Sequence, residues 1–262
     1  MDNDKSKLKN VVNNSGNLLE YLNNKGKNHN YFKFYTEREE VVNNILNTHS
    51  IYLSRGDNWN DLADRNRFNP DGSDVVRYGI CFSFTRSESV AMWMLYAKDS
   101  GYMMDFGSEI INQCLDIDSI DCGTFRGKGF ENIVTLNRDN FKIEILDIVY
   151  FDISKNDSSK FYIKRADEHV DECDKNVVDQ IKFCKKTLPW SYECECRLIV
   201  TINNTIEDID KCDTVKVSFG EKSLEKLKKR IYHSPNTKSG HTYNKSKLTG
   251  KIEWNISGTT TK

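Results

Sequence analysis

Short runs of alternating apolar and polar residues recur along the chain, separated by stretches of helical spacing in no regular order. Residues 80–85 (Ile-Cys-Phe-Ser-Phe-Thr) and residues 193–202 follow a period of two, which is typical of strands. Apolar side chains recur at helical spacing in residues 41–46, 160–186 and 224–231. Because strands and helices are mixed without a regular strand–helix–strand repeat, the pattern predicts an α+β fold.

The composition limits the class of protein. The 262 residues include 38 basic and 39 acidic side chains, a formal net charge of −1, so no global field draws the chain to nucleic acid. The sequence has no run of about 18 apolar residues, as a membrane span requires, and its first residues lack the apolar core of a secretion signal. The eight cysteines fall mostly within predicted helices and strands. We therefore expect a cytoplasmic protein with reduced thiols.

The common phosphate and metal motifs are weak in this sequence. The glycine-rich residues 123–129 lack the gap of a phosphate-binding loop and its Ser or Thr after Lys, so a flexible loop is favoured. Cys194 and Cys196 would share one strand face and could both reach zinc. That face continues as Leu198 and Val200, which favours core packing, and we expect no metal site.

The segment 190–197, Trp-Ser-Tyr-Glu-Cys-Glu-Cys-Arg, holds two carboxylates and a guanidinium on alternate residues. A period of two places Glu193, Glu195 and Arg197 on one strand face. Repulsion between the carboxylates would raise one pKa, while Arg197 would hold the other carboxylate ionised, as in a catalytic cleft. The alternative is a solvent-exposed strand face that carries a Glu–Arg pair.

The segment 81–97 is a predicted strand that leads into an aromatic-rich helix. Ser83 and Thr85 place hydroxyl groups at the junction, where hydroxyls and the first N–H groups of a helix can hold a phosphate or a ribose. The alternative is that Ser87 or Ser89 caps the helix and that Trp93 is buried.

Together with residues 31–36, these two segments resemble a bacterial family known as a domain of unknown function, number twenty-nine seventy-one. The resemblance covers roughly residues 31–256. The matching positions are Phe32-Lys33-Phe34, Ile51 to Ser54, Trp59-Asn60-Asp61, Phe82-Ser83, Met92-Trp93, Tyr96-Ala97, and Trp190 to Arg197.

The order of these motifs is also distantly similar to the ADP-ribosyltransferases. That resemblance implies an α+β fold with a mixed, split β-sheet core and flanking helices. It implies an NAD-binding residue on the first core strand, hydroxyls on a middle strand and a Glu-x-Glu pair on a late strand. Carried over residue by residue, these positions are Lys33 with Tyr35 and Thr36, then Ser83 and Thr85, then Glu193 and Glu195. Lys33 departs from the family, which has His or Arg there.

The resemblance implies a mechanism in which NAD is the substrate and no metal takes part. Glu195 would accept a hydrogen bond from the ribose 2′-OH and stabilise the positive charge that develops when nicotinamide leaves. Glu193 would orient the incoming nucleophile. Trp93 or Tyr96 would pack against the nicotinamide, and Arg197 would complete the binding site.

The leading hypothesis is an ADP-ribosyltransferase-like bacterial toxin or antiphage effector that modifies a nucleic acid or a protein, with an antitoxin or a defence-system component as partner. One alternative is a carboxylate-pair hydrolase that needs no NAD. Another is a non-enzymatic module that senses a nucleotide or a phage component. If the acceptor is a nucleic acid, a local basic patch must attract it, formed by Lys182, Lys185 and Lys186 or by residues 226–230.

The motifs also predict the domain organisation. Residues 1–30 are polar and Asn-rich and are expected to form a loosely attached segment. Because the three signatures must converge on one cleft, residues 31–256 are predicted to form a single α+β domain, followed by a tail of residues 257–262. The polar residues 55–79 are predicted to form a long loop over the site.

Overall fold

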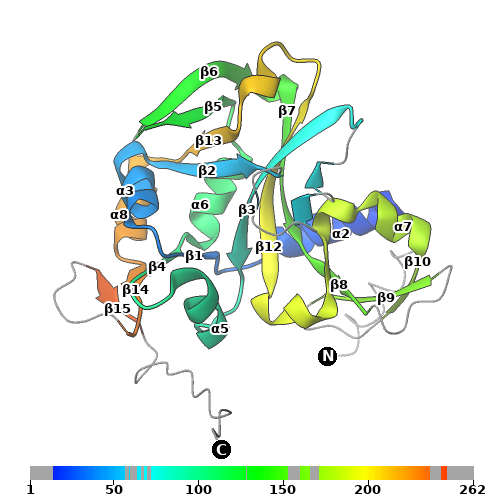
Figure 1. The fold of residues 1–262 in the computed structure, drawn as a ribbon, viewed down its shortest axis with the longest axis horizontal. Helices are drawn as coiled ribbons and strands as arrows, with labels where there is room; N and C mark the ends of the chain where they lie inside the picture. The colour runs from blue at the N-terminus through cyan, green and yellow to red at the C-terminus, as the bar shows by residue number, and fades with distance from the viewer. Residues whose placement is uncertain are drawn as a thin grey trace, which may run out of the picture.

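The structure is a computed structural model in which two β-sheets are flanked by helices (Figure 1). It describes residues 14–56, 59, 64–65, 68–69, 72–127, 129–152, 160–165, 171–236 and 243–246. None of the described helices is both long and apolar enough to cross a membrane. The predicted tail of residues 257–262 lies outside the described residues.

The described strands form an eleven-stranded sheet, almost entirely antiparallel, and a separate four-stranded sheet. The large sheet contains β1 (Lys33–Thr36), β2 (Ser50–Arg55), β3 (Val75–Ser83), β4 (Tyr102–Asp105), β5 (Ser119–Arg126), β6 (Gly129–Asn137), β7 (Phe141–Asp147), β12 (Glu195–Asn203), β13 (Thr214–Ser218), β14 (Ile231–His233) and β15 (Asn244–Lys245). The small sheet contains β8 (Val149–Phe151), β9 (Lys160–Lys164), β10 (Asp171–Asp174) and β11 (Lys185–Thr187).

Helices lie on both faces of the large sheet. They are α2 (Ser15–Lys27), α3 (Glu39–Thr48), α5 (Val90–Met92), α6 (Gly107–Leu115), α7 (Lys175–Gln180) and α8 (Glu221–Lys228). Shorter helical turns are the π-helix η2 (Trp93–Ala97) and the 3₁₀ turns η3 (Arg138–Asn140), η5 (Lys182–Cys184), η6 (Leu188–Glu193) and η7 (Ile209–Lys211). This mixture of strands and helices confirms the predicted α+β class.

Alternate residues of the central strands face two different hydrophobic cores. Ile145 of β7 and Leu198 of β12 belong to a core that also takes in α3, α6 and α8. Their neighbours Leu146 and Ile199 point the other way, into a core with α2, α7 and the small sheet. A third, smaller cluster forms around Trp93 on η2.

One edge of β3 is divided between two partner strands, and this division positions the site. β12 pairs with the opposite edge of β3 along its full length. On the divided edge, Lys33 of β1 lies opposite Ser83, and Ser54 of β2 lies opposite Gly79. Residues 80–82 have no strand partner on that edge within the described part of the chain. The sheet therefore opens between β1 and β2.

The structure corrects four predictions about local structure. The glycine-rich residues 123–126 do not form a flexible loop, because they belong to β5 and pair with β6. Residues 15–27 are not loosely attached, because they form α2 and bury Leu18 and Leu22 completely. Residues 160–186 are not one helix: β9, β10 and β11 flank the short α7, so the apolar spacing there reflects several elements. The polar loop after β2 ends earlier than predicted, since β3 begins at Val75.

Candidate active site

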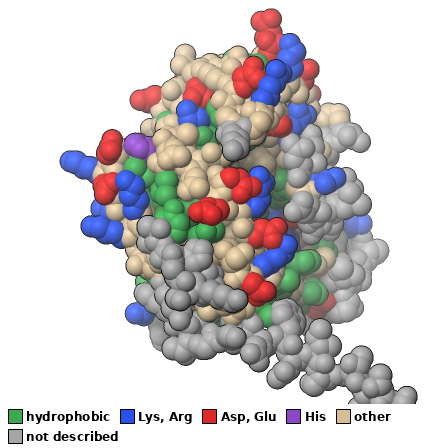
Figure 2. Space-filling view, turned by 60° about the vertical axis from the view of Figure 1, so that its left-hand side comes forward, with side chains coloured by type: hydrophobic (Ala, Val, Ile, Leu, Met, Phe, Trp, Pro, Cys, Tyr) green, Lys and Arg blue, Asp and Glu red, His purple; other side chains and the backbone are tan. Residues whose placement is uncertain are grey.

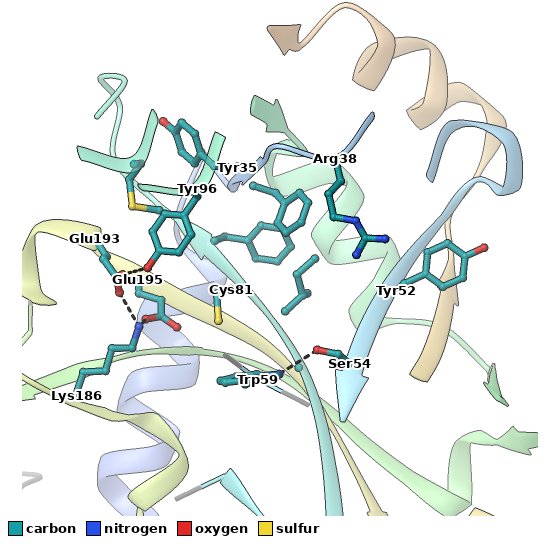
Figure 3. A pocket seen from close by; sticks show the side chains of 15 residues that line it. Tyr35, Arg38, Tyr52, Ser54, Trp59, Cys81, Tyr96, Lys186, Glu193 and Glu195 are labelled. Carbon is teal, nitrogen blue, oxygen red and sulfur yellow. Dashed lines mark hydrogen bonds and ion pairs between the residues drawn. The ribbon is translucent and has the colours of Figure 1, made fainter. Parts of the chain in front are cut away.

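A cavity of about 470 Å³ lies where β1 and β2 diverge beside β3 (Figure 3). Its volume is within the range of small-molecule sites. It is lined by Phe34, Tyr35, Arg38, Tyr52, Ser54, Trp59, Gly79, Ile80, Cys81, Phe82, Met92, Tyr96, Lys186, Glu193 and Glu195. Figure 3 shows that the two glutamates and Lys186 occupy one end, while Arg38 and Tyr52 occupy the other. The cavity thus has an acidic end and a basic, aromatic end, with rings between them.

The two glutamates come from different local structures. Glu193 is the last residue of η6, and Cys194 then adopts a left-handed conformation with φ of 44° before β12 begins at Glu195. The predicted strand therefore starts at Glu195 and not at Glu193. The backbone N–H of Glu195 donates to the Tyr150 hydroxyl at 2.9 Å, which fixes the start of β12 against the small sheet.

Lys186 joins the two carboxylates. Its Nζ lies 2.6 Å from Oε2 of Glu193 and 2.7 Å from Oε2 of Glu195. The Tyr96 hydroxyl donates to the other oxygen of Glu193. All three charged side chains are buried, so one ammonium neutralises part of a double negative charge in a region of low dielectric.

Arg197 holds Glu195 from the other side. Arg197 Nε lies 2.5 Å from Oε1 of Glu195, and Nη2 lies 2.8 Å from Oδ2 of the buried Asp64. Its guanidinium also stacks over the Trp59 ring, 4.8 Å from the ring centroid. Oε2 of Glu195 is buried and makes no well-aligned hydrogen bond in the described structure, so it keeps acceptor capacity beside Lys186.

The environment separates the pKa values of the two glutamates. Burial, followed by the charge of Glu195, raises the pKa of Glu193 to about 6. Burial alone would also raise the pKa of Glu195, but Arg197 and Lys186 outweigh it and hold that pKa well below the usual range. Near neutral pH, Glu195 is therefore a fixed carboxylate, and Glu193 can take up or release a proton.

Arg38 provides a different kind of group at the opposite end of the cavity. Its Nε pairs with Glu40 at 2.6 Å, and both side chains are largely exposed. An exposed pair of this kind contributes little stability and is readily exchanged for a ligand. Nearby, Trp59 Nε1 donates to the Ser54 hydroxyl at 3.0 Å, which fixes the indole as a cavity wall.

Four of the ten predicted site residues line the cavity. They are Tyr35, Tyr96, Glu193 and Glu195. Arg197 lies directly behind this wall and contacts it through Glu195. The predicted convergence of the first, middle and late signatures is therefore seen for these residues.

The other predicted binding residues do not line the cavity. Lys33 Nζ donates to the carbonyl oxygens of Arg86 and Ser87, both at 2.8 Å, so it holds the loop before α5. Ser83 is fully buried beside Thr85, with 3.3 Å between their hydroxyl oxygens. These contacts give Lys33, Ser83 and Thr85 a role in shaping the loop.

Thr36 and Trp93 also lie outside the cavity lining. The Thr36 hydroxyl accepts a hydrogen bond from the backbone N–H of Arg38 at 3.1 Å, next to the cavity. Trp93 is fully buried and donates through Nε1 to Glu88 at 2.9 Å. Its ring packs edge-on against Tyr35, so it supports the wall from behind.

Sequence reasoning missed Lys186, Asp64 and Arg38 as parts of this site. Asp64 lies 133 residues before Arg197, so only the fold brings it to the carboxylates. Lys186 lies seven residues before Glu193, and Arg38 lies two residues after Thr36. The available signal for Lys186 was its closeness in sequence to the Trp190 segment, since β11 leads directly into η6. No comparable local pattern marks Asp64.

Comparisons with family models, with curated proteins and with solved structures found no match for this chain. Within the described residues, no group of three or more His, Cys, Asp or Glu side chains is arranged to hold a metal ion. The fold and the site thus define a mixed α+β protein with a carboxylate pair at one end of a cavity.

Proposed function

We propose that this chain is an enzyme that transfers ADP-ribose from NAD to a macromolecule. The observation that carries the proposal is the pair of glutamates at one cavity, one held ionised and the other with a pKa near 6. A fixed negative charge suits the stabilisation of a cationic ribose, and a carboxylate that titrates near neutrality suits general base catalysis.

The rest of the cavity supports a nucleotide substrate. Its walls are rich in aromatic rings, including Tyr35, Trp59 and Tyr96, which can pack on flat heterocycles. Arg38 lies at the end away from the glutamates, where a guanidinium fork can bind phosphate oxygens.

The chemistry follows from these positions. The bond between ribose C1′ and the pyridinium nitrogen breaks, and its electron pair leaves with nicotinamide, which becomes neutral. Glu195 accepts a hydrogen bond from the 2′-OH and stabilises the positive charge on the ribose. A nucleophile of the acceptor then attacks C1′ and gives its proton to Glu193. Lys186 and Arg197 keep Glu195 ionised throughout.

A test of this proposal compares the unchanged protein with Glu195→Gln. Nicotinamide release from NAD should fall about 100- to 1,000-fold in the variant, since one charge-stabilising group is lost. Circular dichroism and thermal unfolding check that the variant is folded, and Glu193→Gln provides a second variant that keeps Glu195. If the unchanged protein leaves NAD intact with both nucleic-acid and protein acceptors, the transferase proposal is wrong.

The same pKa values favour one second candidate, a glycosidic-bond hydrolase that needs no NAD. In that enzyme Glu193 would donate a proton to the leaving group, as a carboxyl with a pKa of about 6 can. Lys33 donates to the carbonyl oxygens of Arg86 and Ser87 and therefore does not point into the cavity to bind the NAD ribose. The pH dependence separates the two candidates, because the hydrolase would lose activity above pH 6 and the transferase below it.

A further inference from the structure

Exposed large hydrophobic side chains are concentrated beside Glu193. Within the described part of the chain, those reported as exposed are Val90, Leu95, Tyr96, Phe125, Trp190 and Tyr192. All except Phe125 lie on α5, η2 or η6. We call these five residues the apolar rim. Apolar side chains gathered in this way on a protein surface commonly mark an interaction site.

The two segments that carry the apolar rim adjoin each other and the proposed base. α5 contacts η6, and the Tyr96 hydroxyl of η2 donates to Glu193, the last residue of η6. Trp190 and Tyr192 form a ring pair with centroids 6.1 Å apart. A partner that covers the apolar rim would thus lie next to the carboxylate that receives the nucleophile's proton.

The backbone conformation of η2 also exposes part of the apolar rim. η2 is a π-helical turn, a rare conformation that is frequent at functional sites. It keeps Trp93 fully buried and leaves Leu95 46% exposed. The turn that supplies the hydroxyl for Glu193 thus also presents Leu95 to solvent.

The charges around the apolar rim do not suit nucleic acid. Lys185 and Lys186, expected to form a basic patch with Lys182, are buried and paired with acidic side chains. In residues 84–98 and 182–193, the exposed basic residues of the described surface are Arg86, Lys182 and Lys98, which pairs with Glu37. The other expected basic patch, residues 226–230, lies on and after α8, where Lys226 and Lys228 pair with Glu109 and Glu225. Acidic and basic side chains are also interspersed on the face shown in Figure 2. Nucleic-acid binding relies on many unpaired cations, whereas protein interfaces have aromatic, charge-depleted centres.

We propose that the acceptor is a protein, which docks an apolar segment on the apolar rim and presents its nucleophile to Glu193. This inference rests on the proposed transferase function and specifies its acceptor class. Tyr96 would serve both the cavity and the docking surface. Leu95 and Tyr192 lie outside the cavity lining and would serve docking alone.

The test uses biotin-labelled NAD with the full chain in bacterial lysate, followed by separate protease and nuclease digestion. The label should be lost on protease treatment and survive nuclease treatment. Leu95→Ser and Tyr192→Ser should each reduce labelling of the lysate about tenfold, because each removes a contact from the centre of the interface. Both variants should release nicotinamide from NAD at the unchanged rate when water is the acceptor.

Phe125→Ser is the matched control. Phe125 is also exposed, but it lies on β5, away from α5 and η6 (Figure 1). Because the Phe125 ring packs on Tyr52 of the cavity lining, nicotinamide release is measured for Phe125→Ser as well, and the ratio of labelling to release should be unchanged. Label that survives protease and is lost with nuclease would overturn the protein acceptor, as would full labelling by the two rim variants. Loss of labelling caused by a change from dimer to monomer, seen by light scattering, would assign the rim to a second copy of the chain. Failure of nicotinamide release in the unchanged protein would instead overturn the proposed function.

Discussion

At the residue scale, the site depends on two glutamates whose carboxylates have different charged and hydrogen-bonding neighbours. Glu195 faces a guanidinium and an ammonium, whereas Glu193 shares the ammonium and receives a phenolic hydrogen bond. The sequence predicted the two carboxylates and Arg197, and it predicted that the two carboxylates have different pKa values. It did not predict that Lys186 bridges the carboxylates, because this depends on how η6 places β11 beside them. It did not predict the turn at Cys194, which depends on one residue with positive φ.

The Tyr96 hydroxyl should set the pH at which the transferase loses activity. Transfer requires ionised Glu193, whose pKa is about 6, so activity should fall as the pH drops through 6. The hydrogen bond from Tyr96 favours the ionised form. Tyr96→Phe should therefore raise the pKa and move the acidic limb upward by about 0.5 to 1 pH unit, the equivalent of one hydrogen bond. A pH–rate profile with saturating NAD measures this shift.

The outcome that contradicts this role is an acidic limb that stays in place in Tyr96→Phe, or one that persists in Glu193→Gln. Glu193→Gln should remove the limb and reduce transfer about 100- to 10,000-fold.

At the element scale, strands with a clear period of two were predicted well, and short apolar patterns were not. The strands at residues 80–83 and 195–202 are present, and the helix at 224–231 is present as α8 up to Lys228. Spacing in residues 160–186 matched a helix by coincidence, since Val177 and Val178 lie in α7, whereas Lys160–Lys164 and Asp171–Asp174 form β9 and β10. Whether such a segment forms a helix or a strand depends on pairing with other strands, and the local sequence pattern carries no information about that pairing.

α2 was not predicted because most of its surface is polar and its apolar stripe is narrow. Its packing on β7 can be tested at Gly26. A Cβ added at Gly26 would lie 2.4 Å from the carbonyl oxygen of Ile145, which is backbone and cannot turn away. Gly26→Ala should therefore lower the free energy of unfolding by about 1–3 kcal/mol, although alanine favours helices. Chemical denaturation measures the change.

Gly16 is the control in the same helix. A Cβ there would lie 3.2 Å from Oδ1 of Asn14, which caps α2 by accepting from the N–H of Asn17; turning it away costs one exposed hydrogen bond and no backbone movement. Gly16→Ala should change stability by less than about 1 kcal/mol in either direction. Equal effects of the two substitutions would show that α2 does not pack on β7 through Gly26.

At the scale of the whole molecule, the charged cluster joins the two sheets. Lys186 belongs to β11 of the small sheet, while Glu195 and Arg197 belong to β12 of the large one. The cavity therefore depends on the packing of the sheets together, as well as on its own lining. This explains why the sequence could indicate the carboxylates and Arg197 but not the full site: Lys186 comes from the second sheet, and Asp64 lies outside the described strands.

Replacing Lys186 with Met should destabilise the whole molecule, because it leaves two buried carboxylates that repel each other. The expected loss is about 3–5 kcal/mol, seen as a melting temperature lower by about 10 °C. Without the ammonium the pKa of Glu193 should rise further, so Glu193 is protonated at pH 5 and the repulsion is relieved. The loss of stability relative to the unchanged protein should therefore be smaller at pH 5 than at pH 8. Lys185→Met, next in β11, removes a buried lysine that pairs with one half-exposed carboxylate, Asp179; no pair of buried carboxylates is left without a counter-charge, so it should cost less than Lys186→Met.

A second substitution shows whether repulsion causes the loss. Glu193→Gln in the Lys186→Met background removes one of the two negative charges and should restore part of the lost stability, whereas Glu193→Gln alone should not stabilise the protein. If the double variant is no more stable than Lys186→Met at pH 8, the lysine stabilises the junction of the sheets by packing. The separation of the two glutamate pKa values would then need another cause, and the assignment of Glu193 as the base would lose its physical basis.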